Sequence, residues 1–173
     1  PDSMFSYLEQ RHLLFSQDVF GMHLASSERF ADEVDELRLQ EEAAKYYANI
    51  VLPYSPLVKK LLHKTGSLAL RFDIVAPDHG PVYRRVQDVK WIMDCYSRWA
   101  SQLPGARVLV IYDTMWGSTG LMARAVAEGV AQEGVSVKLL PLAGSHRSDV
   151  ATEVLEAGAL IVGSPTLNNN MYP

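Results

Sequence analysis

The sequence predicts an α/β fold in two domains, the second of which begins a doubly wound parallel sheet. Three observations support this prediction. Pro104 and Gly105 break the chain between two regions of different pattern. After this break, apolar runs alternate with helical stretches through short loops, which requires parallel strands and right-handed crossovers. The apolar fraction of 48% and the charged fraction of 21% are typical of a globular protein.

The first region mixes strands and helices. Residues 13–15 predict a short strand, and residues 73–77 predict a second strand whose end presents Asp78 and His79. Residues 27–48 favour a helix by intrinsic propensity. None of these segments repeats, and none has low complexity.

Two more helices are predicted before the break. Ser55 is a suitable N-cap for a helix over residues 57–64, because Pro56 fits the first helical turn. Apolar residues recur at three- and four-residue steps over residues 89–103, which indicates an amphipathic helix. Cys95, the only cysteine, lies within it and is expected to be a buried thiol in a reducing compartment.

The second region alternates regularly. We predict strands over residues 107–113, 135–140 and 159–162, with helices over residues 119–132 and 149–157 between them. The first of these helices should face the sheet through Met122, Ala123, Val126 and Val130. In such sheets ligands bind at the carboxyl ends of the strands, where two polar loops are expected to meet.

The first polar loop is rich in hydroxyls, holds one glycine and has no lysine or arginine. Neutral donors and the helix dipole would therefore have to bind a phosphate here. No motif for triphosphates or dinucleotides is present. An ordinary strand-to-helix turn is the alternative interpretation. The candidate phosphate-binding residues are Thr114, Met115, Trp116, Gly117, Ser118 and Thr119.

The second polar loop offers amides and hydroxyls. A flavin ring has an apolar face and polar edges, so it suits such mixed surroundings, with Trp116 and Leu167 as apolar contacts. A plain polar turn is the alternative. Both loops at one end of a sheet favour flavin mononucleotide (FMN). The candidate ring-binding residues are Ser164, Pro165, Thr166, Leu167, Asn168 and Asn169.

The first region carries candidate metal ligands. Carboxylate and imidazole groups suit iron, manganese or zinc, and Asp18, His23, Asp78 and His79 supply both. Asp18 and His79 are the strongest candidates, whereas His23 is expected to lie at the surface or beside the ligands. A turn carboxylate that caps backbone groups is the alternative for Asp18. A metal site needs three or four ligands, so these residues would form part of one.

Several motifs resemble those of known families. Thr114-Met-Trp-Gly-Ser-Thr119 and Gly163-Ser-Pro-Thr-Leu-Asn-Asn169 are similar to the phosphate and ring loops of flavodoxin-like modules. Phe15-Ser-Gln-Asp-Val-Phe-Gly21 and Ala76-Pro-Asp-His-Gly80 resemble segments of the flavodiiron proteins, also called A-type flavoproteins. The resemblance implies that residues 1–103 are the C-terminal part of a metallo-β-lactamase-like αββα domain. Residues 104–173 would then be the first half of a flavodoxin-like sheet.

The resemblance also implies a function. Asp18 would bridge two irons and His79 would be a terminal iron ligand, in an enzyme where FMN feeds electrons to the diiron site. That site would reduce dioxygen to water, nitric oxide to nitrous oxide, or both. A rubredoxin-like electron donor and a head-to-tail homodimer are implied as partners. We expect the chain to be a piece of a longer protein and inactive alone.

Two other functions remain open from the residues. One is an FMN electron carrier without a working metal site, and the other is a zinc hydrolase of the metallo-β-lactamase type. The net charge of −4 provides no basic surface for nucleic acid. No apolar run approaches the ~18 residues that span a membrane, and no signal peptide is evident. We therefore expect a cytoplasmic protein.

Overall fold

The computed structural model describes residues 4–171, which form two compact units. One unit ends at Gln102 and the other begins at Leu103. The first contains β1 (Ser6–Leu8), β2 (Leu13–Gln17), α1 (Glu36–Tyr46), the π-helical segment η3 (Tyr47–Val51), α2 (Ser55–Ser67), β3 (Ile74–Pro77) and α3 (Val86–Ser101). The second contains β4 (Arg107–Tyr112), α4 (Ser118–Gln132), β5 (Ser136–Pro141), α5 (Arg147–Val154), β6 (Ala159–Gly163), β7 (Thr166–Leu167) and β8 (Asn170–Met171). None of the helices within residues 4–171 combines the length and apolar character that a membrane span requires.

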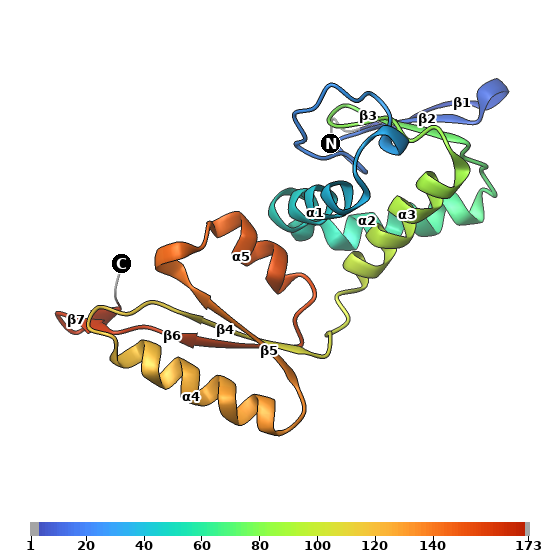
Figure 1. Ribbon diagram of the computed structural model, residues 1–173. Coiled ribbons are helices and arrows are strands. Elements are labelled where there is room, and N and C mark those ends of the chain that lie inside the picture. Colours follow the sequence, from blue (N-terminus) through green and yellow to red (C-terminus); the bar gives the residue numbers. More distant parts are fainter. Residues whose placement is uncertain (1–3, 172–173) are drawn as a thin grey trace. The chain divides into compact units, whose positions relative to one another are not determined.

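The first unit is built on a three-stranded sheet in the order β1-β2-β3. Strand β2 pairs antiparallel with β1 and parallel with β3. One face of this sheet is buried, with Leu14 opposite Val75, and α3 packs against it. Phe15 points to the other face and is half exposed. Because β2 and β3 run in parallel, their carboxyl ends lie at the same edge of the sheet (Figure 1).

An aromatic cluster forms much of the core of the first unit. Phe20, which follows β2, lies with its ring centroid 4.8 Å from that of Tyr96 on α3. Tyr47 contacts both Tyr96 and Trp99, at centroid separations of 4.9 and 5.2 Å. Aromatic pairs at such distances contribute beyond simple burial. The cluster therefore fixes the segment after β2 against the helices.

The helix predicted over residues 27–48 begins only at Glu36, where the Asp35 carboxylate accepts a hydrogen bond from the Arg38 backbone N–H at 3.0 Å. Before that point Phe30 forms a β-bridge with Val82, and the chain then makes only the short 3-10 helix η2 (Ala31–Glu33). Arg84 stacks 3.9 Å from the centroid of the Phe30 ring. Tertiary contacts thus override the helical propensity of this segment.

The prediction that Ser55 caps a helix is wrong. Helix α2 includes Ser55 and continues to Ser67, beyond the predicted end at Lys64. The Ser55 hydroxyl is buried, donates to the backbone carbonyl of Leu52 at 2.8 Å and bonds with the Tyr47 hydroxyl at 2.8 Å. Its role is to satisfy polar groups in the core.

The second unit is a parallel sheet in the order β5-β4-β6, with helices on both faces. Helix α4 covers one face and α5 the other, as Figure 1 shows. The residues of β4 alternate between the two: Val110 packs in the cluster with α4, and Leu109 in the cluster with α5. This is the doubly wound arrangement that the sequence predicted.

The sheet-facing side of α4 differs from the prediction. Ala123 is buried as expected, but Met122 is 68% exposed and Val126 is 40% exposed. Gly120 and Ala127 are buried with Ala123 instead. A stripe of small residues at this spacing brings the helix axis close to the strands, whereas larger side chains are turned away.

Gly158 is expected to tolerate no side chain. A Cβ atom there would overlap the carbonyl oxygen of Gly105, since the turn between α5 and β6 lies directly against the segment leading into β4. Gly158→Ala should therefore lower the free energy of unfolding by about 1–3 kcal/mol, the range typical of overpacking. Gly144→Ala is the matched control, because a Cβ at Gly144 meets no atom within 4 Å. Urea unfolding that finds both variants equally stable would contradict this close approach.

Candidate functional site

The two polar loops predicted to bind FMN leave the second sheet side by side. Strand β4 pairs in parallel with β6, with Tyr112 opposite Gly163. Just beyond this pair, the Asp113 backbone N–H donates to the Gly163 carbonyl at 3.0 Å. Strand β5 lies on the other side of β4, so the chain reverses its direction of winding at this point. Flavodoxins are an established example of ligand binding at such a switch point.

The first loop is a turn that leads directly into helix α4. The Gly117 backbone N–H donates to the Thr114 hydroxyl at 3.0 Å, and Gly117 has a φ of +87° that side chains rarely adopt. Helix α4 begins at Ser118 without a side-chain cap, so the first N–H groups of the helix face outward. A Cβ at Gly117 would meet no atom within 4 Å, which leaves space for a ligand.

These features fit a phosphate. Residues 113–119 contain no cation, so hydroxyls, backbone N–H groups and the helix dipole are the available donors. The dipole supplies about 0.3–1 kcal/mol when exposed and up to ~2 kcal/mol when partly buried. Trp116 is 88% exposed, so its indole ring is free to contact a bound ring system.

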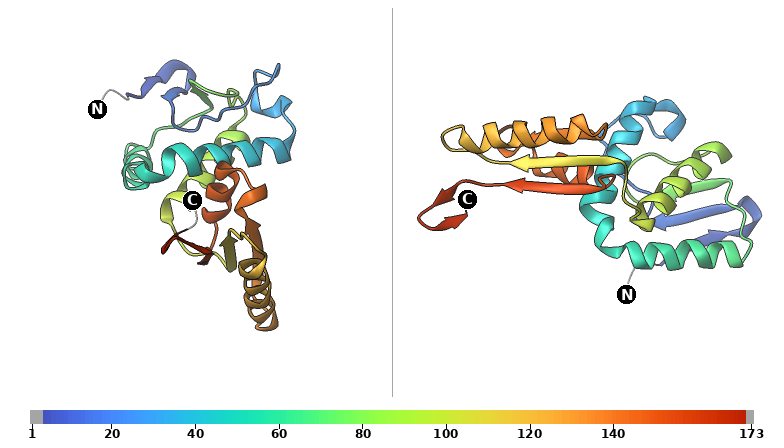
Figure 2. Two further views of the ribbon diagram at one scale, coloured as in Figure 1. Left: turned by 90° about the vertical axis from the view of Figure 1, so that its left-hand side faces the viewer. Right: turned by 90° about the horizontal axis from the view of Figure 1, so that it is seen from below.

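The second loop, which the sequence predicted as a polar ring-binding loop without strands, is a β-hairpin. Strands β7 and β8 pair antiparallel around Asn168 and Asn169, whose φ angles are 51° and 62°. Two consecutive positive φ angles characterise a tight hairpin turn, and asparagine tolerates them well. Asn170 donates through its side-chain amide to the Asn168 carbonyl at 3.1 Å. Figure 2 shows that this hairpin projects beyond the carboxyl end of β6.

Gly163 joins the two loops, and sequence reasoning did not single it out as a site residue. Its carbonyl accepts from Asp113, as described above, and its α-carbon packs against the other loop. A Cβ at Gly163 would lie 3.2 Å from Thr119 Cγ2 and 3.4 Å from Tyr112 Cβ. The missing side chain therefore lets Thr119 sit against the end of β6. A glycine at a strand end is the signal that indicates such close approach.

The candidate metal ligands Asp18 and His79 lie together at the carboxyl edge of the first sheet. Each follows one of the two parallel strands, β2 and β3, and the Asp18 Oδ1 and His79 Nε2 atoms are 3.3 Å apart. Two ligand atoms that bind one metal at about 2.1 Å, at a right angle, lie about 3 Å apart. Their separation therefore fits a shared metal, and both side chains are accessible, at 62% and 49%.

Backbone hydrogen bonds join the two ligand-bearing segments. The Asp78 N–H donates to the Gln17 carbonyl at 2.9 Å, and the Met22 N–H donates to the His79 carbonyl at 3.2 Å. Gly80, with a φ of +84°, lies so close to Met22 that a Cβ would come within 2.7 Å of Met22 Cγ. Across residues 4–171, no group of three or more His, Cys, Asp or Glu side chains gathers to hold a metal. Asp18 and His79 therefore fit part of a metal site.

His23 and Tyr46 border these ligands. The His23 ring contacts the rings of His79 and Tyr46 edge-on, at centroid distances of 5.5 and 4.8 Å. Burial, together with the Asp18 and Asp78 carboxylates, raises the pKa of Tyr46 to about 12. Burial makes the larger contribution to this shift, and the two carboxylates that add to it also favour a nearby cation. Sequence reasoning missed Tyr46, because its position beside Asp18 arises only from the packing of α1.

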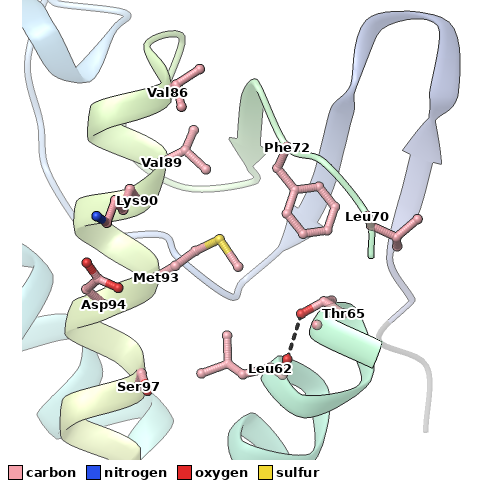
Figure 3. A pocket seen from close by; sticks show the side chains of 11 residues that line it. Leu62, Thr65, Leu70, Phe72, Val86, Val89, Lys90, Met93, Asp94 and Ser97 are labelled. Carbon is pink, nitrogen blue, oxygen red and sulfur yellow. Dashed lines mark hydrogen bonds between the residues drawn. The ribbon is translucent and has the colours of Figure 1, made fainter. Parts of the chain in front are cut away.

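A pocket of about 390 Å³ lies elsewhere in the first unit, between α2, α3 and the segment before β3 (Figure 3). Its wall is largely apolar, with Leu62, Phe72, Val89 and Met93. Of the described residues that line it, none belongs to the candidate metal or flavin sites. The pocket therefore gathers neither the candidate metal ligands nor the candidate flavin-binding residues.

Comparisons with known proteins cover the whole chain. The flavodoxin family model matches residues 110–173. The chain is 45% identical over 173 residues to a nitric oxide reductase of Moorella thermoacetica, covering 100% of this chain and 43% of that protein. The structure of rubredoxin oxygen:oxidoreductase from Desulfovibrio gigas matches with a TM-score of 0.96 and 39% identity, over 100% of this chain and 43% of its own. The flavodiiron protein of Giardia intestinalis matches with a TM-score of 0.92 and 34% identity, over 100% of this chain and 42% of its own.

The chain thus spans less than half the length of these relatives. Flavodiiron proteins carry FMN and a pair of irons, which are the two cofactors predicted from the sequence. These matches cover 100% of this chain, so the similarity runs through both units. Over its whole length the chain is similar to part of the flavodiiron proteins.

Proposed function

We propose that this chain is part of an FMN- and diiron-dependent oxidoreductase that reduces dioxygen to water, nitric oxide to nitrous oxide, or both. FMN supplies one- and two-electron redox chemistry when bound, and a pair of non-haem irons supplies the site at which the gas is reduced. The observation that carries the proposal is the pairing of Asp18 with His79 at 3.3 Å, in a chain that also brings both polar loops to one sheet edge.

Each candidate residue has a defined role in this proposal. Asp18 would bridge and partly neutralise the two metals, and His79 would hold one of them through Nε2. Thr114, Ser118, Thr119 and the N–H groups of α4 would bind the phosphate, and the residues from Ser164 to Asn169 would border the ring. Residues 1–103 and 104–173 are the proposed domains. The described residues provide only part of a metal site, so we expect residues 1–173 alone to be inactive.

The names of the relatives bear on substrate and partner. One relative is a nitric oxide reductase and another is a rubredoxin oxygen:oxidoreductase. We therefore propose a gaseous substrate and a rubredoxin-like donor, with a head-to-tail homodimer as the assembly. These reductase names favour this function over a zinc hydrolase. Flavin without iron in the purified protein would instead support the electron carrier.

Removal of either candidate iron ligand should deplete the metal selectively. Asp18→Ala and His79→Ala in the full-length protein are expected to lower iron content by about 10-fold or more, because loss of groups around a metal costs at least that much affinity. FMN content should stay at the wild-type level. His63→Ala, on α2 and outside the site, is the control. Wild-type iron occupancy in both ligand variants, measured by elemental analysis, would contradict the assignment.

Gly163→Ala should weaken FMN more than riboflavin, which lacks the phosphate. A Cβ at Gly163 would press on Thr119 and displace its hydroxyl from the phosphate loop. A cost of about 1.4 kcal/mol corresponds to ten-fold weaker binding. Flavin fluorescence quenching measures both affinities. Gly129→Ala on α4 is the control, since a Cβ there meets no atom within 4 Å. An equal loss for both flavins would mean that Thr119 does not contact the phosphate.

A further inference from the structure

The turn that carries Asp18 is strained on both sides of that residue. Gln17 has a φ of 50° and Phe20 a φ of 70°, values that residues with side chains adopt rarely. Phe20 is also bulky and only 1% exposed, so it cannot relax toward solvent. Such a conformation persists only where surrounding contacts hold it in place.

Two buried hydroxyls hold this turn. Ser16 donates through Oγ to the Val19 carbonyl at 2.6 Å, and Tyr83 donates through its hydroxyl to the Phe20 carbonyl at 2.9 Å. Both Ser16 and Tyr83 are fully buried. A buried carbonyl without a donor is costly, so each hydroxyl opposes a change in the turn.

Tyr83 is also fixed to the segment that carries the other candidate ligand. Its backbone N–H donates to the Val75 carbonyl at 2.9 Å, and its carbonyl accepts from the Val75 N–H at 2.9 Å. Val75 lies in β3, the strand that leads to His79. Tyr83 therefore connects the two segments. Its backbone bonds with β3, and its hydroxyl bonds with the turn that carries Asp18.

We propose that Tyr83 is a positioning residue for the candidate metal site, and that its hydroxyl sets the separation between the Asp18 carboxylate and the His79 imidazole. This inference rests on the proposed function. Without the hydroxyl, the Phe20 carbonyl loses its donor and the strained turn can move relative to β3. The remaining backbone bonds from Asp78 and Met22 would keep the two segments together, so the effect is a change in ligand geometry rather than loss of the fold.

The test compares Tyr83→Phe with Tyr47→Phe in the full-length protein. The two variants are closely matched, because Tyr47 is also fully buried and its hydroxyl bonds with Ser55 at 2.8 Å. Tyr47 and Ser55 lie on η3 and α2, neither of which carries a candidate ligand. Ser16→Ala, which removes the other donor to the turn, is a second variant.

Two readouts report the metal geometry independently of turnover. The first is the rate at which bound Fe²⁺ passes to a chelator, and the second is the visible absorption of the Co²⁺-substituted protein, which depends on ligand arrangement. Tyr83→Phe should release Fe²⁺ about 10-fold faster than wild type, as expected for loss of a group that orients a ligand. It should also shift the Co²⁺ bands, and Ser16→Ala should shift them in the same direction. Tyr47→Phe should match wild type, and all variants should retain FMN.

Wild-type Fe²⁺ release and a wild-type Co²⁺ spectrum in Tyr83→Phe would overturn the inference, whatever the result for Ser16→Ala. Equal acceleration in Tyr83→Phe and Tyr47→Phe would also overturn it, because that result indicates general loosening of the core. A wild-type protein that takes up FMN but neither Fe²⁺ nor Co²⁺ would instead refute the proposed diiron function, and this inference would fall with it.

Discussion

The parallel pairing of neighbouring strands is the constraint on which both candidate sites depend. Parallel strands end at the same edge of a sheet, so the residues that follow them are brought together whatever their distance in sequence. In the first unit, β2 and β3 deliver Asp18 and His79 to one edge. In the second unit, β4 and β6 deliver the phosphate-loop candidates and the hairpin. Sheet topology thus brings the residues of each candidate site together. Glycines then allow the following loops to approach closely, and hydroxyls hold those loops by hydrogen bonds.

Much of this organisation was predictable because it depends on local pattern. The continuous apolar runs of β4 and β6, and the polar loops after them, are visible in the sequence, and topology rules then place those loops together. The parts that escaped prediction depend on contacts between distant residues. Phe30 is held by Val82, so the first helix starts later than its propensity indicates. Ser55 serves a buried network with Tyr47 instead of a helix end.

The candidate sites also combine features that the local sequence predicts with features that depend on contacts between distant residues. The sequence identified the ligand-type residues by their chemistry, as it did for Asp18 and His79. It did not identify the groups that set their geometry, such as Tyr83 and Gly163. Tyr83 acts through a hydrogen bond to a distant carbonyl, which has no local sequence signature, whereas the strand-end position of Gly163 was the only local signal of its close approach to Thr119. The positive φ of Phe20 could not be predicted from the sequence either, because the contacts around this residue impose it.

The two candidate sites also differ in the charge of their surroundings. Burial and, to a lesser extent, the Asp18 and Asp78 carboxylates raise the pKa of Tyr46, and these carboxylates favour a cation beside the candidate metal ligands. The phosphate loop has no formal charge of its own apart from Asp113 at its start. Attraction there comes from short-range dipoles, which mobile salt ions screen less than they screen the field of an exposed lysine or arginine. A flavin phosphate bound by this loop, as proposed, would therefore lose less affinity as salt concentration rises than one bound by lysine or arginine side chains.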